Sequence, residues 1–392
     1  MQTSFLKIFF YSLVTWFLLL ISFSDEIFPQ TTLTETPIQI QIQKCWESNS
    51  YNYGSDNPLF LPSRYFKSKN FDFVDHPNSF LSFNDGSLKL IDTKTGNENW
   101  QTETGGELAT EPFMQDEGIY IVIKPLPNNL LETSEPRKTH YSLRFINKET
   151  GITEWTRIFS HEGNIYLYAL KGIAFLINPE SQISAFDQQN GNILWKKSYP
   201  GKLFSAPFFF DDKAVFPKDD GISLISLTEG RVIFHEKGIN YKLKSLTSNG
   251  EMIFFGDEKG FLHGLKIGSR KRRWKYRLGG AISSVSYQEG YILVTSLDNF
   301  VYYFSVANGK LIWKKRVAGR IINGPLIFNR NALILVEGSS TTLFLDLSDG
   351  KIVNQITFPE ETIFAGNPKK VNEVLVIPTQ KNIIAYSFGQ CP

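Results

Sequence analysis

The chain has 392 residues, 42% of them hydrophobic and 20% charged, values that are typical of globular proteins and exclude a disordered or collagen-like chain. Its 41 Lys and Arg residues balance 39 Asp and Glu residues, so the formal charge of +2 provides no strong field for nucleic acid, and no nucleic-acid partner is expected. The 2 cysteines are too few for a disulfide-rich scaffold, a four-cysteine zinc site or an iron–sulfur cluster.

Residues 1–24 have the pattern of an export signal. An uncharged, mostly apolar run at residues 8–24 follows Lys7 and precedes Asp25 and Glu26. The run fits either a cleaved signal peptide or a retained membrane anchor. The flanking charges place the remainder outside the cytoplasmic membrane, so we expect a periplasmic or cell-envelope protein whose membrane association depends on this run. Residues 25–36 are expected to form a linker.

The rest of the chain repeats with a period near 40 residues. The fragments TGNENW, TGITEW, NGNILW, EGRVIF and NGKLIW each place an aromatic residue four positions after a glycine. Two weaker copies, SRKRRW and DGKIVN, keep the phase, and successive copies lie 39–41 residues apart after a first interval of 55. The expected structural anchors are Gly96, Trp100, Gly151, Trp155, Gly191, Trp195, Gly230, Phe234, Trp274, Gly309, Trp313 and Gly350.

The long first interval contains a Pro-rich, polar segment at residues 125–140. We expect it to be a single loop insertion, which is either merely tolerated or functional.

Each repeat contains short runs of Val, Ile, Phe and Tyr separated by turn residues, the pattern of β-strands. Four strands in about 40 residues predict the blade of a β-propeller, so residues 37–392 are expected to form a single domain. We interpret the recurring Trp as packing that covers the gap to the next blade, because rings that recur blade by blade do not converge into a ligand cage.

The strings LKLIDTKTGNENW, ISAFDQQNGNILW and VYYFSVANGKLIW resemble the repeat of PQQ-type propellers. The resemblance spans about residues 70–390, and in repeat number and length it is most similar to BamB of the bacterial outer-membrane assembly machine. The family also includes quinone-dependent dehydrogenases and stress-sensing luminal domains, so the resemblance is specific for fold and not for function. No cysteine follows the apolar run directly, which departs from the lipid-anchored BamB.

The two ends of the chain are expected to close the ring. After Gly350 the sequence supplies three further strands and stops, so an eighth blade lacks its outer strand. Residues 37–46 alternate apolar and polar and end in Trp46, which can take the position that Trp100 has in its own blade. We therefore expect an all-β, eight-bladed propeller of four-stranded antiparallel blades, closed by an N-terminal outer strand.

The same alignment predicts a disulfide at the seam. Cys45 falls at the equivalent of position 99, and aligning Asn382 with Gly86 puts Cys391 at the equivalent of position 95. These positions face each other across a hairpin turn, at a separation that suits a disulfide in an oxidising compartment. Two unpaired cysteines near the chain ends are the alternative.

The sequence offers few signs of catalysis. Asp92, Asp187 and Asp346 recur at equivalent turns of different repeats, so they are expected to shape turns. The adjacent cysteines of quinone enzymes, a haem-attachment motif and a Gly-x-Ser-x-Gly elbow are missing from the sequence, so we expect no catalytic residue, cofactor or metal. The histidines are scattered without metal-ligand spacing at His76, His140, His161, His235 and His263.

Arg270, Lys271, Arg272 and Arg273 form a dense basic cluster at an outer turn. The cluster is either a solvated turn or a contact for an acidic partner or anionic lipid head groups.

The favoured function is a monomeric, non-enzymatic scaffold that holds another envelope protein, as the resemblance to BamB implies, with a role in envelope or outer-membrane protein assembly. Edge strands or blade loops would engage the partner. Two alternatives stay open: a sensor or small-ligand-binding propeller that uses the central channel, and a PQQ-dependent oxidoreductase.

Overall fold

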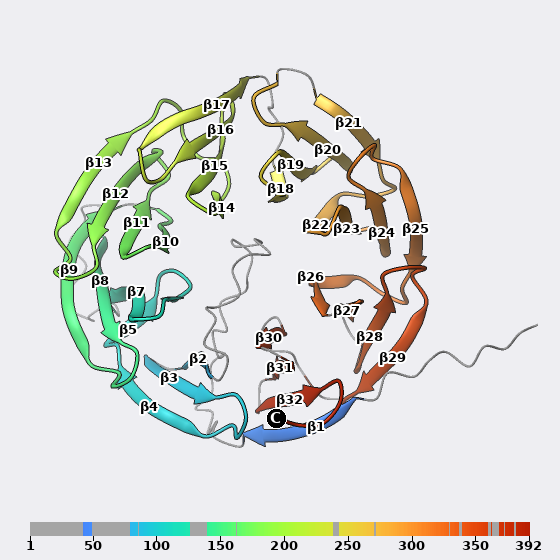
Figure 1. The fold of residues 1–392 in the computed structure, drawn as a ribbon, viewed down its shortest axis with the longest axis horizontal. Coiled ribbons are helices and arrows are strands. Elements are labelled where there is room, and N and C mark those ends of the chain that lie inside the picture. Colours follow the sequence, from blue (N-terminus) through green and yellow to red (C-terminus); the bar gives the residue numbers. More distant parts are fainter. Residues whose placement is uncertain are drawn as a thin grey trace, which may run out of the picture. The chain divides into compact units, whose positions relative to one another are not determined.

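The computed structural model of the chain describes residues 42–48, 79–84, 86–125, 139–161, 163–237, 243–269, 272–328, 330–336, 339–359, 362, 368–371, 373–379 and 382–392. The regular secondary structure of these residues consists of β-strands alone. The strands form eight antiparallel sheets arranged in a ring (Figure 1). The expected all-β, eight-bladed propeller is confirmed.

Three expectations fall outside the described part of the chain: the export segment at residues 1–24, the linker at 25–36, and most of the insertion at 125–140. In the part that is described, no helix is long and apolar enough to cross a membrane.

Blades 1 to 4 follow one another along the chain, each running from the ring centre outward. Blade 1 has three described strands, β2 (Ser79–Asn84), β3 (Ser87–Asp92) and β4 (Glu98–Glu103). Blade 2 contains β5 (Gly106–Leu108), β6 (Phe113–Met114), β7 (Gly118–Pro125), β8 (Thr139–Asn147) and β9 (Thr153–His161), and both β5 and β6 pair with β7. Blade 3 contains β10 (Tyr166–Leu170), β11 (Ile173–Ile177), β12 (Gln182–Asp187) and β13 (Ile193–Ser198). Blade 4 contains β14 (Phe208–Phe210), β15 (Lys213–Lys218), β16 (Gly221–Ser226) and β17 (Arg231–Lys237).

Blades 5 to 8 complete the ring. Blade 5 contains β18 (Leu243–Ser248), β19 (Met252–Asp257), β20 (Phe261–Lys266) and β21 (Arg272–Arg277). Blade 6 contains β22 (Ile282–Gln288), β23 (Tyr291–Ser296), β24 (Phe300–Ser305) and β25 (Leu311–Arg316). Blade 7 contains β26 (Ile321–Phe328), β27 (Asn331–Val336), β28 (Thr341–Asp346) and β29 (Ile352–Thr357). Blade 8 contains β30 (Lys369–Val371), β31 (Val374–Pro378), β32 (Ile383–Ser387) and, as its outer strand, β1 (Gln43–Ser48).

In four blades the turn before the outer strand is built by a short oxygen-bearing side chain and a glycine. In blade 1, Asp92 Oδ1 accepts the backbone N–H groups of Lys94 at 3.0 Å and Thr95 at 2.8 Å. The N–H of Gly96 donates to the Asp92 carbonyl at 2.9 Å, and Gly96 has a φ of +73°, which glycine adopts without strain. Asn147, Asp187 and Asp346 accept backbone N–H groups at the equivalent turns. These side chains therefore serve as turn formers in blades 1, 2, 3 and 7.

The anchor residues meet between blades. The Trp100 Nε1–H donates to the Lys148 carbonyl of the next blade at 2.6 Å, and a Cβ placed on Gly151 would lie 2.7 Å from the Trp100 ring. Only glycine leaves room for the ring at this distance. The same pairing of a Trp with the next blade's glycine occurs at Trp155 with Gly191, Trp274 with Gly309, and Trp313 with Gly350.

The hydrophobic core is divided among the contacts between blades. Eight buried apolar clusters occur in the described residues, and each combines side chains from two neighbouring blades. A single blade therefore buries its faces only when both of its neighbours are in place, as in other repeat architectures.

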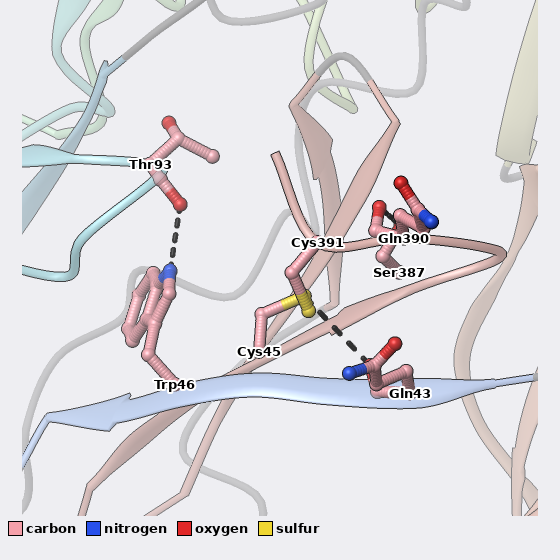
Figure 2. Close-up of a disulfide and its surroundings, with 7 residues drawn as sticks. All are labelled: Gln43, Cys45, Trp46, Thr93, Ser387, Gln390 and Cys391. Atoms are coloured by element: carbon pink, nitrogen blue, oxygen red, sulfur yellow. Dashed lines mark hydrogen bonds between the residues drawn. A yellow bond between two sulfur atoms is a disulfide. The ribbon is translucent and has the colours of Figure 1, made fainter.

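The ring closes where β1 joins blade 8. Trp46 pairs with Ala385 of β32, and its Nε1–H donates to the Thr93 carbonyl of blade 1 at 2.6 Å (Figure 2). A Cβ on Gly96 would lie 2.6 Å from the Trp46 ring, so this junction repeats the other Trp–Gly contacts. Closure by an N-terminal outer strand is thus as expected, but the strand runs from Gln43 to Ser48, and residues 37–41 of the expected strand lie outside the described residues.

Cys45 and Cys391 form a disulfide across the seam, with their Cα atoms 5.4 Å apart (Figure 2). The pairing was expected, but the register was wrong by one residue. Trp46 pairs with Ala385 as Trp100 pairs with Leu90, so Cys391 occupies the position of Gly96 and not that of residue 95. The cause is the turn between β31 and β32, which spans residues 379–382 and is longer than the turn between β2 and β3.

Replacing Cys45 with Ser should lower the free energy of unfolding by about 2–5 kcal/mol, because the disulfide closes a loop with a sequence separation of 346 residues. Urea denaturation measures this loss. Reduced wild-type protein should show the same loss, while the variant should not respond to reductant. An unchanged unfolding midpoint in the variant would contradict the role of the disulfide in closing the ring.

Gly309→Ala should destabilise the protein more than Gly268→Ala. Both glycines have positive φ, at +68° and +75°, so alanine at either costs about 1–2 kcal/mol in backbone strain. Only the Cβ at Gly309 meets a ring, that of Trp274 at 2.5 Å, whereas nothing lies within 4 Å at Gly268. Displacing the ring should add about 1–3 kcal/mol, measurable by urea denaturation. Equal losses in the two variants would show that the Trp–Gly contact contributes no stability.

Candidate functional site

The outer strands present unpaired backbone groups around the circumference of the ring. Each of them pairs with its own blade on one side, and the strand order of the described sheets places no strand on its other side. The free N–H and C=O groups of such an edge can pair with an extended segment of another chain. Side chains that differ between blades on this outer circumference would therefore determine which edge a partner binds.

Two neighbouring outer strands carry an exposed apolar group that we call the apolar rim. It consists of Ile193 and Leu194 of β13, which are 58% and 50% exposed, and Val232 and Ile233 of β17, which are 44% and 37% exposed. Scattered exposed apolar residues are normal, but paired ones on adjacent edges form a patch of the kind that binds proteins. The equivalent positions of β4 hold Glu98 and Asn99, whereas β25 and β29 each carry one exposed apolar residue there, Ile312 and Ile352, so an exposed pair on each of two neighbouring strands is not required by the repeat.

The apolar rim is held on a rigid junction between blades 3 and 4. Lys197 Nζ donates to the carbonyls of Gly230 at 3.0 Å and Glu229 at 3.1 Å, and the Tyr199 hydroxyl donates to the Gly230 carbonyl at 3.0 Å. Burial raises the pKa of Tyr199 to about 12, which keeps the phenol a neutral donor. Lys197 thus covers Gly230 where five other junctions use a Trp ring, and the Trp195 ring lies tilted against Phe175 with the ring centres 5.9 Å apart.

The structure leaves the dense basic cluster untested as a partner contact. Arg270 and Lys271 lie outside the described residues, and Arg272 and Arg273 begin strand β21, where Arg272 pairs with Leu265. The cluster thus extends from the turn into the outer strand.

Four of the five histidines are described, and the structure does not bring them together. His140 lies 2.8 Å from the Ser160 hydroxyl, His161 lies 3.6 Å from Glu180, and the buried His263 contacts Asp257 at 3.0 Å. His76 is outside the described residues. Within the described ranges, no group of three or more His, Cys, Asp or Glu side chains could hold a metal ion.

Sequence reasoning missed one constellation, a Ser–His–Asp series in blade 4. Ser223 Oγ lies 2.9 Å from His235 Nδ1, and His235 Nε2 lies 3.3 Å from Asp220 Oδ2. Ser223 and His235 pair across β16 and β17, so the repeat phase could have revealed their contact. Ser223 is only 1% exposed, which keeps its hydroxyl away from any substrate and makes the series a link between strands.

Two charged groups from inner positions of the ring interact with each other. Glu111 precedes β6 in blade 2, and Lys369 begins β30 in blade 8. Burial raises the pKa of Glu111 and lowers that of Lys369, while the attraction between the two charges opposes both shifts. The two groups belong to the blades that flank blade 1.

A groove of about 290 Å³ lies at the seam between β1 and the turn of blade 1. Its two carboxylates already have partners in the fold, because Glu98 contacts Lys89 at 2.8 Å and Glu47 contacts Lys44 and Asn382. The groove is lined by Glu47, Ser48, Ile91, Thr95, Gly96, Asn97 and Glu98.

Comparison with known proteins supports the fold assignment. A family model described as outer membrane protein assembly factor BamB matches residues 160–283 and 259–385, which together span more than half of the chain. No curated protein matches the sequence.

Three solved structures share the propeller fold. BamB from Moraxella catarrhalis is 12% identical, with a TM-score of 0.62, and the match covers 89% of this chain and 98% of that one. The computationally designed Ika8 protein is 13% identical, with a TM-score of 0.63 and coverage of 79% and 93%. The C-terminal WD40 domain of Sif2 is 12% identical, with a TM-score of 0.60 and coverage of 90% and 99%. At these identities the likeness shows the fold alone.

The Ser–His–Asp series should not react with a serine-directed fluorophosphonate probe, because the Ser223 hydroxyl is buried. Intact mass after incubation with excess probe should be unchanged, and peptide mapping should find Ser223 unmodified. Modification of Ser223 that disappears in His235→Gln would contradict the structural role and indicate an activated nucleophile.

Proposed function

The chain belongs to the family described as outer membrane protein assembly factor BamB, and on that premise we propose that it is a non-enzymatic scaffold that binds another protein outside the cytoplasmic membrane. The observation that carries this proposal is the apolar rim. Its four residues, Ile193, Leu194, Val232 and Ile233, are exposed on two neighbouring outer strands whose outer edges pair with no described strand. A water-facing surface of this kind is stabilised when a partner covers it.

Two features support a location in the periplasm or cell envelope. Residues 1–24 have the pattern of an export segment. The disulfide between Cys45 and Cys391 persists in oxidising compartments and is rare in the cytosol. On this basis we place the scaffold in envelope or outer-membrane protein assembly, the process for which the family is described.

The apolar rim suits a protein partner better than a small molecule. Exposed side chains on a convex circumference cannot enclose a small ligand, whereas they can be covered by an extended segment that pairs with an edge strand. Full burial of one such side chain contributes about 1.5–3 kcal/mol, so partial burial of four can offset a large share of the cost of association.

A photo-reactive amino acid at position 194 or 233 should crosslink the protein to an envelope protein in living cells. The same residue at position 352, where Ile352 is also exposed but lies on blade 7, is the matched control and should give little crosslinking. Mass spectrometry of the crosslinked bands identifies the partner.

Replacing Ile193, Leu194, Val232 and Ile233 with Thr should change thermal stability little, since these side chains are only partly buried and Thr favours β-strands, while the partner no longer co-purifies from native expression levels. Retention of the same partner by this variant would refute the apolar rim as the binding surface. Crosslinking that is equal at all three positions would count against it as well.

A further inference from the structure

Blades 5 and 6 carry the same arrangement of one aromatic ring and two cations at equivalent positions. Phe261 begins β20 and pairs with Arg277 of β21, while Phe300 begins β24 and pairs with Arg316 of β25. A lysine precedes each arginine by two residues, and all four cations are exposed. We call Lys275, Arg277, Lys314 and Arg316 the basic rim.

The aromatic rings hold the cations in place without neutralising them. Lys275 Nζ lies 5.1 Å from the centre of the Phe261 ring, and Arg277 Cζ lies 5.5 Å from it. In the next blade, Lys314 Nζ lies 5.2 Å from the Phe300 ring centre. Such contacts contribute about 0.5–1 kcal/mol each at exposed sites and leave the positive charge available to a partner.

Two carboxylates of the same hairpins are engaged elsewhere, and the exposed Glu258 of the β19–β20 turn forms no ion pair with these cations within the described part of the chain. Asp257 contacts the buried His263 at 3.0 Å, and Asp298 accepts the Tyr302 hydroxyl at 2.5 Å. Among the described residues, no ion pair involves any cation of the basic rim. Four unneutralised charges therefore lie on two adjacent outer strands.

The other described blades do not repeat this arrangement, so the propeller fold does not require it. At the cross-strand position of Phe261 and Arg277, the equivalent pairs are Ser87 with Glu103, Gln182 with Ser198, Gly221 with Lys237, and Thr341 with Thr357. A feature that recurs in only two neighbouring repeats and is exposed points to binding and not to folding.

We infer that the basic rim binds an extended acidic segment of a partner protein, which adds as a strand to the free edge of β21 or β25. This inference rests on the proposed scaffold role and names the chemistry of the partner. The two cations on each strand are two residues apart, about 6.8 Å, which is the spacing of alternate side chains on a paired strand. Carboxylates at alternate positions of the segment would meet them, while its backbone pairs with the strand edge.

An anionic membrane surface fits these observations less well. A lipid head-group layer has no two-residue period and forms no backbone hydrogen bonds with a strand edge. Phe261 and Phe300 are also half-buried beneath the cations, so they are not free to insert into a bilayer.

The test uses a short fluorescein-labelled peptide with Glu at alternate positions and Thr or Val between them. Fluorescence anisotropy should show binding to the full chain that weakens as salt is added. Replacing all four basic-rim residues with Ser should weaken binding at least about tenfold, because the charge pairs are lost. Two further variants, one with both cations of β21 replaced and one with both cations of β25 replaced, should show which strand edge contributes more to peptide binding.

Three controls make the outcome decisive. Lys196→Ser with Lys237→Ser, at equivalent exposed positions of β13 and β17, should leave binding unchanged. A peptide of the same composition with its Glu residues contiguous should bind clearly less well. Vesicles of phosphatidylcholine with phosphatidylglycerol should not retain the protein through the basic rim.

Equal binding of the two peptides, unaltered binding by the four-residue variant, or retention by vesicles without binding of the alternating peptide would each overturn the inference. Crosslinking at the apolar rim together with no peptide binding would remove the acidic-segment partner and leave the scaffold proposal intact. Peptide binding without any crosslinked partner would support the basic rim and count against the apolar rim as the binding surface.

Discussion

The contact between a Trp ring and the glycine of the next blade is the interaction on which the rest of this structure depends. It combines a hydrogen bond to a turn carbonyl with a packing surface that no other residue in place of glycine would permit, as for Trp100 over Gly151. The apolar clusters also depend on contact between neighbouring blades, because each cluster is shared between two blades. The blades therefore stabilise one another, and no blade has a core of its own.

An array of this kind has a weak point where its ends meet. Here the last repeat lacks an outer strand, and β1 supplies it from the opposite end of the chain. Trp46 makes the same contact with Gly96 that the other Trp residues make at their junctions, and the disulfide from Cys45 to Cys391 links the two ends covalently. Asn354 stands in place of Trp at the junction of blades 7 and 8, and the disulfide lies in blade 8, next to this junction.

Much of the fold could be predicted from the sequence because its strongest signals are local. A glycine with positive φ four residues before an aromatic residue recurs in five of the eight blades, and a closing strand could be inferred from Trp46, which ends a strand-like segment outside the repeats. The one-residue error at Cys391 arose because turn length is not fixed by the repeat. The repeat phase could have indicated that Ser223 pairs with His235, but the side-chain contacts of this pair and of the cations over Phe261 and Phe300 are established only by the folded blade. The apolar rim was missed because the sequence does not distinguish Ile193 and Leu194 from buried strand residues, and only the structure shows that they are exposed.

The rigid ring leaves functional variation to its circumference, where the apolar rim of blades 3 and 4 is followed in chain order by the basic rim of blades 5 and 6. Both depend on a closed ring to hold adjacent blades in position. Hydrogen–deuterium exchange of Trp46→Ala with the disulfide intact tests that closure most directly. The backbone amides of β32 and of the turn at residues 92–97 should lose protection together, while those of blade 5 keep theirs. Unchanged protection of β32 and of this turn in the variant would contradict closure through Trp46.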